Sequence, residues 1–234
     1  MLPLGDESPT RLTPIVNYTI IAASTGVFLW QISSTSDHFT SILVQYGVIP
    51  RLIANGQNLH TLITNIFLHG GWTHLAGNML FLWIFGDNIE DNIVCRSSSK
   101  WVGRLVYVGF YLLCGIAASL TWMITALNSP YPAVGASGAI AGVLGAYFIF
   151  YPNRMVRTLF GYGFFFRVIR VKAYTMIGFW FVIQFFMAFL PINSGVAFWA
   201  HVGGFVVGVL LAMIFRPRPR VIQTYYGLDR TRNL

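Results

Sequence analysis

Apolar residues are grouped along the chain in long stretches, and shorter segments between them hold most of the polar residues. A run of about 20 apolar residues can cross the roughly 30 Å hydrocarbon core of a bilayer as a helix. We predict six such membrane-spanning helices, with boundaries good to about four residues. They cover residues 14–32, 73–93, 102–124, 133–151, 173–190 and 196–215.

The segment between the first two predicted spans, residues 33–72, has a different pattern. Pro, Gly and Asn interrupt its short apolar runs, as in GVIPRLIANGQNLHTLITNIFLHGG at residues 47–71. It is too long for a simple turn and too broken for a span, so we expect a structured loop lying partly in the membrane interface. The predicted fold class is therefore all-α, a polytopic six-helix bundle with an interfacial loop between its first two helices.

We expect one transmembrane domain over residues 1–234. Its core lies at about 14–215, after a short N-terminal segment and before a basic tail at 216–234. No Lys or Arg precedes Arg11, and no small-residue cleavage site follows the first apolar run, so we expect no cleaved signal peptide.

Composition supports the membrane interpretation. Hydrophobic residues make up 56% of the chain and charged residues 9%, whereas a soluble domain carries about 25% charged residues. So little charge cannot cover a surface that faces water, which indicates an integral membrane protein.

The net charge of +8 follows the predicted topology. Fourteen of the fifteen basic residues fall on one side of a six-span arrangement, and the other side receives only Arg51. The positive-inside rule makes the rich side cytoplasmic, with both termini there, in a multi-pass protein of the cell membrane. Because topology accounts for the excess charge, we expect no nucleic-acid partner, and some basic residues are expected to contact anionic lipid.

Inside the predicted spans a polar side chain indicates function by default, and four such side chains stand out. They are His74 and Asn78 in the second span, Ser137 in the fourth and His201 in the sixth. All three spans enter from the outer side, and at about 1.5 Å per residue each group lies within roughly 10 Å of its outer end. Alone, each has an ordinary explanation in helix packing or hydrogen bonding. Their shared depth indicates one site.

Together these residue types suit acyl transfer. A serine hydroxyl is a weak nucleophile and needs a base such as His201 within hydrogen-bond reach. The oxyanion formed at the attacked carbonyl needs donors, which Asn78, His74 and the backbone N–H of Ser137 can supply. Asn78 follows His74 by four residues, so both project from one helix face.

No acidic residue shares this depth, so we predict a Ser–His dyad rather than a triad. The acidic residues of the second span lie near its cytoplasmic end: Asp87, Glu90 and Asp91. Two G-x-x-x-G patterns, Gly138 with Gly142 and Gly204 with Gly208, predict close contact between the fourth and sixth spans. Such contact would bring a short serine side chain within reach of a histidine.

Three motifs, in this order, resemble those of the rhomboid family of intramembrane serine proteases. HGGWTHLAGN at residues 69–78 is similar to the family's H-x-x-x-x-H-x-x-x-N, and GASG at 135–138 to its G-x-S-G. AHVGG at 200–204, continued to Gly208, is similar to A-H-x-x-G-x-x-x-G. The resemblance covers about residues 14–215.

The resemblance implies that Ser137 is the nucleophile and His201 the general base. It implies that His74, Asn78 and Gly135 form the oxyanion and substrate-binding site with the Ser137 backbone. It assigns supporting roles to His69, Gly138, Gly204 and Gly208. The implied substrates are transmembrane segments of other proteins, cut near the outer membrane boundary, with no metal or cofactor. The oligomeric state stays open.

The sequence departs from the family pattern at two places. Some members carry an aromatic residue four positions after the serine, stacked on the histidine, and here that residue is Ala141. We therefore expect Trp199 or an aromatic residue of a neighbouring helix to orient His201. His60 and Thr61 stand where the family often has a Trp-Arg pair, which affects the anchoring of the first loop.

The fifth span, with TMIGFWFVIQFFMAFL at residues 175–190, carries large aromatic side chains and no stripe of small ones. We expect it to pack loosely and to move against the second span so that a substrate can enter, unless its aromatic residues are ordinary lipid-facing bulk. The short PINSG loop, residues 191–195, is expected to cap the site.

Three other interpretations compete with a protease. The first is a catalytically silent relative that binds transmembrane clients, although such proteins usually lack the serine or the histidine. The second is a metal site of His69, His74 and His201, although no carboxylate joins them and residues five apart do not share a helix face. The third is a transporter, for which broken helices in repeated halves are expected.

Overall fold

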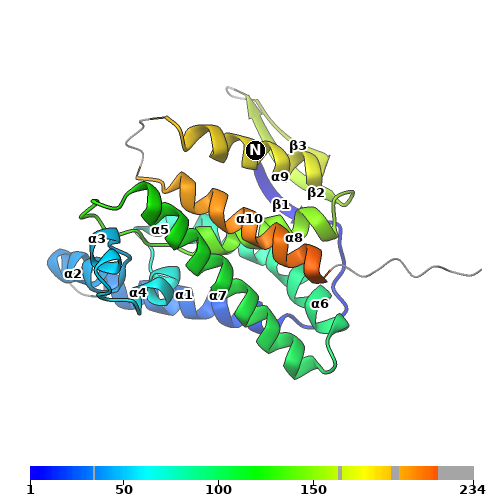
Figure 1. The fold of residues 1–234 in the computed structure, drawn as a ribbon. Coiled ribbons are helices and arrows are strands. Elements are labelled where there is room, and N and C mark those ends of the chain that lie inside the picture. The colour runs from blue at the N-terminus through cyan, green and yellow to red at the C-terminus, as the bar shows by residue number, and fades with distance from the viewer. Residues whose placement is uncertain (34, 163–164, 191–194, 216–234) are drawn as a thin grey trace, which may run out of the picture.

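The computed structural model describes residues 1–33, 35–162, 165–190 and 195–215, and it is mostly helical (Figure 1). Three helices are long and apolar enough to cross a membrane: α1 (Ile15–Ile32), α7 (Lys100–Thr125) and α10 (Phe198–Phe215). Two shorter helices are also apolar, α8 (Ser137–Phe150) and α9 (Ala173–Met187). These five agree closely with five predicted spans, and the largest difference is the start of α8 at Ser137 instead of residue 133.

The second predicted span consists of three consecutive pieces. These are α5 (Trp72–Phe81), a π-helical turn η2 (Leu82–Gly86) and α6 (Asp87–Arg96). π turns inside α-helices disturb the regular backbone ladder. Here the side-chain amide of Asn17 in α1 donates to the Leu82 carbonyl at 3.0 Å and accepts from Tyr107 Oη at 2.9 Å. A Cβ at Gly86 would clash with Asn17, so the absence of a side chain at Gly86 leaves room for the buried Asn17 amide.

The segment between α1 and α5 is structured, as expected. It contains the helices α2 (Ser36–Tyr46), α3 (Pro50–Ala54) and α4 (Thr61–Thr64) and the 3₁₀ turn η1 (Asn65–Phe67). Val48 and Ala133 exchange backbone hydrogen bonds of 3.0 and 2.8 Å, and the Gly135 N–H donates to the Asn65 carbonyl at 2.9 Å. These bonds fix the backbone that leads into Ser137 at the start of α8.

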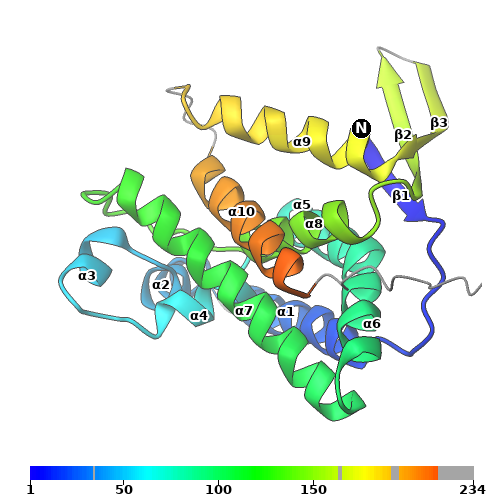
Figure 2. The same ribbon diagram turned by 45° about the vertical axis from the view of Figure 1, so that its right-hand side comes forward.

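The expectation of an all-α chain missed a three-stranded antiparallel sheet. Its strands are β1 (Leu2–Asp6), β2 (Met155–Tyr162) and β3 (Phe165–Lys172), in the order β1-β2-β3. β2 and β3 contain the β-branched and aromatic residues that favour strands. β3 leads directly into α9, so the sheet lies at the end of the bundle where α9 begins (Figure 2).

The carboxylate of Asp6 joins the N-terminal strand to the helices. It accepts hydrogen bonds from Tyr147 Oη in α8 and from Asn88 Nδ2 in α6, the latter at 3.0 Å. Burial raises the pKa of Asp6, against the opposing effect of the Tyr147 hydrogen bond. The N-terminal segment is therefore packed into the fold through a buried polar contact.

The acidic residues of α6 hold the start of α1. Glu90 accepts the backbone N–H groups of Val16 at 3.1 Å and Asn17 at 2.7 Å. Asp91 Oδ1 accepts those of Arg11 and Leu12 at 2.9 and 2.8 Å. A helix start leaves backbone N–H groups without intrahelical partners and favours negative charge, so Glu90 stabilises the start of α1, while Asp91 holds the segment that precedes it.

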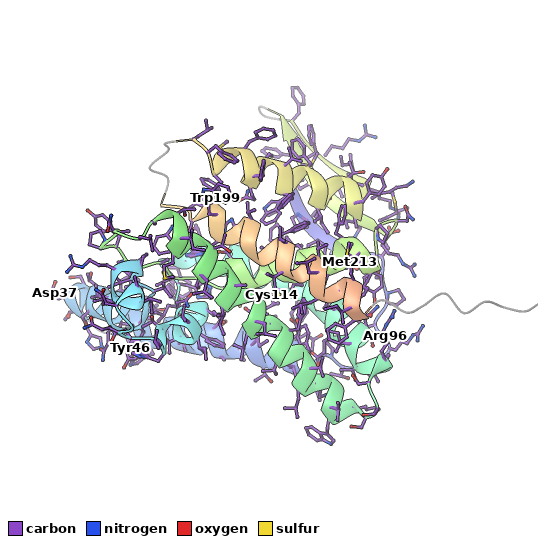
Figure 3. All side chains as sticks on the ribbon, viewed as in Figure 1. Asp37, Tyr46, Arg96, Cys114, Trp199 and Met213 are labelled. Atoms are coloured by element: carbon purple, nitrogen blue, oxygen red, sulfur yellow. The ribbon has the colours of Figure 1, made fainter. Side chains whose placement is uncertain are left out.

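α10 packs against α8 and α7 in the middle of the bundle (Figure 1). The two predicted glycine patterns meet in this contact. A Cβ at Gly204 would clash with the Gly138 carbonyl oxygen, and one at Gly208 with the backbone of Gly142. A Cβ at Gly142 would clash with Cys114, which Figure 3 labels on α7. The backbones of α8 and α10 therefore touch directly.

Replacing Gly208 with alanine should separate these helices. We expect Gly208→Ala to lower the free energy of unfolding by about 1–3 kcal/mol, because the added methyl group has no space. Thermal unfolding in detergent, followed by circular dichroism, measures the effect. The matched control is Gly109→Ala in α7, where a Cβ would meet nothing within 4 Å. Equal melting temperatures for the two variants would contradict the close contact.

Candidate active site

Ser137 and His201 lie together, on the two helices that share the glycine contact. Ser137 is the first residue of α8, and His201 lies in the first turn of α10. The distance from Ser137 Oγ to His201 Nε2 is 2.9 Å, and both residues are half-buried. At this distance the two atoms are within hydrogen-bond reach, so the histidine nitrogen can take the proton of the serine hydroxyl.

Both neighbours that orient the His201 ring come from α9. Nδ1 lies 2.7 Å from Gln184 Oε1, and the ring is tilted by 33° against Trp180, with 6.0 Å between centroids. Trp199, labelled at the start of α10 in Figure 3, instead contacts Phe185 and Phe189. Of the two sequence-based alternatives, the structure matches an aromatic residue of a neighbouring helix.

Gln184 was missed by the sequence analysis. Its signal was present, because it is an amide side chain inside an apolar helix, where polar groups usually have a partner or a function. Ala141, in the position of the family's aromatic residue, is buried in α8.

His74 and Asn78 lie on α5 and face the segment that precedes Ser137. The Gly70 N–H donates to His74 Nδ1 at 3.3 Å, which leaves the proton of the neutral ring on Nε2. Asn78 Nδ2 is buried and has no hydrogen-bond partner among the described residues. Both side chains therefore have a donor available.

Gly135 brings these donors close to the serine. Its φ of +127° is in a region that other residues rarely adopt. A Cβ at this position would lie 2.7 Å from His74 Cε1 and Nε2 and 3.8 Å from Asn78 Nδ2. The His74 ring therefore occupies the space of the missing side chain, two residues before Ser137.

His69 holds the junction between the loop and α5. Its backbone N–H and carbonyl bond to the Gln31 side chain at 3.1 and 3.2 Å, and its Nδ1 lies 3.2 Å from the Phe67 carbonyl oxygen. Burial lowers the pKa of His69 to about 4, so its ring is neutral at pH 7 and Nδ1 can donate. Its ring centroid lies 5.2 Å from that of His74.

A cavity of about 1180 Å³ connects these groups. Its lining includes Ser137, His201, His74 and Asn78, with side chains from α5 and α9 at its sides. A cavity of this size has room for an extended peptide segment beside the serine. Most of the PINSG segment expected to cap it, residues 191–194, lies outside the described residues.

The competing interpretation of a metal site concerns the grouping of metal-binding side chains. Within residues 1–33, 35–162, 165–190 and 195–215, no three His, Cys, Asp or Glu side chains are grouped so that they could hold a metal ion.

Comparisons with known proteins agree with the motifs. The model of the Rhomboid domain matches residues 56–218, which is more than half of the chain. The chain is 39% identical over 136 residues to rhomboid protease GluP of Bacillus subtilis (strain 168), and the match covers 57% of this chain and 24% of GluP. RHOMBOID-like protein 5 of Arabidopsis thaliana is 30% identical over 186 residues, which cover 76% of this chain and 51% of that protein.

A third relative is similar in length. YdcA, a rhomboid protein of Bacillus subtilis (strain 168), is 31% identical over 209 residues, which cover 87% of this chain and 89% of YdcA. The chain thus spans about a quarter of GluP and about half of the Arabidopsis protein, but most of YdcA. The domain match and these relatives show that the chain belongs to the rhomboid family.

Proposed function

We propose that this protein is an intramembrane serine endopeptidase that cleaves transmembrane segments of other membrane proteins near the outer membrane boundary. The observation that carries the proposal is the 2.9 Å contact between Ser137 Oγ and His201 Nε2 at the wall of the large cavity. Family membership supports the reaction class, because GluP is named a rhomboid protease.

In the proposed reaction, Ser137 Oγ attacks the carbonyl carbon of a substrate peptide bond while His201 Nε2 takes the hydroxyl proton. The C–N bond then breaks, and His201 returns that proton to the leaving amine, which leaves an acyl group on Ser137. A water molecule then loses a proton to His201 and its oxygen bonds to the acyl carbon. The ester bond to Oγ breaks, His201 gives the proton to Ser137 Oγ, and the acyl group leaves as a carboxylic acid.

The oxyanion formed in each step needs donors that point at it. His74 Nε2–H and Asn78 Nδ2–H lie beside Gly135, and the backbone N–H of Ser137 is at the start of α8, where it has no intrahelical acceptor. The electropositive end of the helix adds to the stabilisation of a negative charge. We assign all three donors to the oxyanion site.

The predicted six-span topology, with both termini cytoplasmic, is part of the proposal. Under it, the cavity lies at the outer end of the bundle, where water can reach it. Phe81 of α5 and Trp180 of α9 both line the cavity. This supports entry of a substrate between α5 and α9, the second and fifth spans of the topology.

The decisive test is cleavage of a single-span model substrate by the reconstituted protein. We expect Ser137→Ala to lower the cleavage rate by at least about a thousandfold, because it removes the nucleophile. A fluorophosphonate should label Ser137, as mapped by mass spectrometry, and the label should be absent from the variant. The control is Ser98→Ala, an exposed serine outside the cavity, which should keep the wild-type rate.

Cleavage by Ser137→Ala at the wild-type rate would refute the proposal. If the wild-type protein binds the model substrate but neither cuts it nor accepts the label, the alternative of a silent client-binding relative is correct.

The oxyanion assignment gives a second prediction. We expect Asn78→Ala to lower kcat by about 100- to 1000-fold with little change in KM, because its donor acts mainly on the transition state. Steady-state kinetics on the model substrate separate the two constants. Asn153→Ala, an exposed asparagine, is the control and should keep the wild-type rate. A change confined to KM would place Asn78 in ground-state binding instead.

A further inference from the structure

We propose that Gln184 is the positioning residue of His201. It orients the histidine ring as the aspartate does in a Ser–His–Asp triad, but its side chain is uncharged. This rests on the proposed function of the Ser137–His201 pair. The contact that points to it is the 2.7 Å separation between Gln184 Oε1 and His201 Nδ1.

The proton positions of a working dyad require such an acceptor. To take the proton of Ser137, His201 Nε2 must be unprotonated, so the neutral ring carries its proton on Nδ1. An amide oxygen can only accept a hydrogen bond, so Gln184 Oε1 favours the tautomer with its proton on Nδ1. The other tautomer would carry the proton on Nε2, which could not then accept the serine proton. The hydrogen bond also fixes the rotation of the ring, which leaves Nε2 directed at Ser137 Oγ.

The same bond serves the charged intermediate. When His201 has taken the proton, both ring nitrogens donate, and the Gln184 carbonyl dipole stabilises the cation at Nδ1. Among the described residues, the other groups that contact the ring are the Ser137 hydroxyl and the Trp180 indole, and the titratable side chain of His74 lines the same cavity. Among the described residues, no carboxylate is hydrogen-bonded to His201.

The position of Gln184 ties the histidine to α9. The first turns of α9 are anchored, because Ala173, Met176 and Ile177 are buried and the Ala173 N–H donates to the Arg154 carbonyl at 2.8 Å. The half that carries Gln184 is more open, because none of the buried residues of α9 lies after Ile177. Figure 2 shows α9 at the edge of the bundle beside α10. The Nδ1 acceptor is therefore present only while this half of α9 lies against α10.

The test compares two replacements of Gln184 in the full-length reconstituted protein. Gln184→Met keeps the length of the side chain but removes the amide oxygen, and we expect kcat to fall about 10- to 100-fold with KM unchanged. Gln184→Glu restores an acceptor and adds a negative charge, so we expect kcat to recover. Because the charge favours protonated His201, the acidic limb of the pH–rate profile should move about one unit to higher pH.

The pH shift separates positioning from a packing role, which would leave the profile in place. Ile183→Met, the neighbouring position on α9, controls for a methionine in this helix, and thermal unfolding of each variant controls for folding. The inference is overturned if Gln184→Met cleaves at the wild-type rate, or if the profile of Gln184→Glu does not move. In either case loss of cleavage in Ser137→Ala would still support the proposed function, whereas full activity of Ser137→Ala would remove both.

Discussion

The direct backbone contact between α8 and α10 is the constraint on which the site depends. Serine has a short side chain, so it can reach a histidine of another helix only where the two helices touch. Gly138 follows Ser137 directly, Gly204 lies three residues after His201, and a Cβ on Gly204 would collide with the Gly138 carbonyl oxygen. The closest approach of the two backbones and the 2.9 Å contact between the side chains are therefore parts of one arrangement.

The carboxylates near the sheet and the buried amide of Asn78 have different surroundings. The carboxylates of Asp6, Glu90 and Asp91 all accept hydrogen bonds from other elements. By contrast, Asn78 Nδ2 is buried without a partner among the described residues. Burying an unpaired donor costs free energy, so such a group is expected where a ligand or a transition state will use it. The three carboxylates stabilise the fold. Other buried polar atoms among the described residues, such as Asn92 Oδ1 of α6, also lack a partner, but of these residues Asn78 alone lines the cavity that holds Ser137, where its donor is available for chemistry.

Five helices and the residues of the candidate site could be predicted from the sequence because both have local signals. Apolar stretches gave five helices, and polar side chains in three spans gave the residues that the structure brings together. The sheet was missed although β2 and β3 carry β-branched and aromatic residues. The pairing of β1 with β2, with Leu2 opposite Leu159, joins distant parts of the chain and has no local signal. The π turn in the second predicted span likewise has a long-range contact, because Asn17 of α1 donates to the Leu82 carbonyl of η2, and neither segment alone reveals this pairing.

Gln184 was missed for a further reason, which concerns the energy of burying a polar group. An aspartate at this depth would have to be desolvated as an anion, and an ionised side chain is among the most costly groups to place among apolar helices. An amide oxygen accepts the same Nδ1–H bond, holds the same tautomer and is far less costly to bury. A search of the predicted spans for a carboxylate that completes a triad therefore finds none, although Gln184 supplies a hydrogen-bond acceptor for His201. Beside a Ser–His pair in apolar surroundings, a neutral amide is therefore favoured over a carboxylate as the group that orients the histidine.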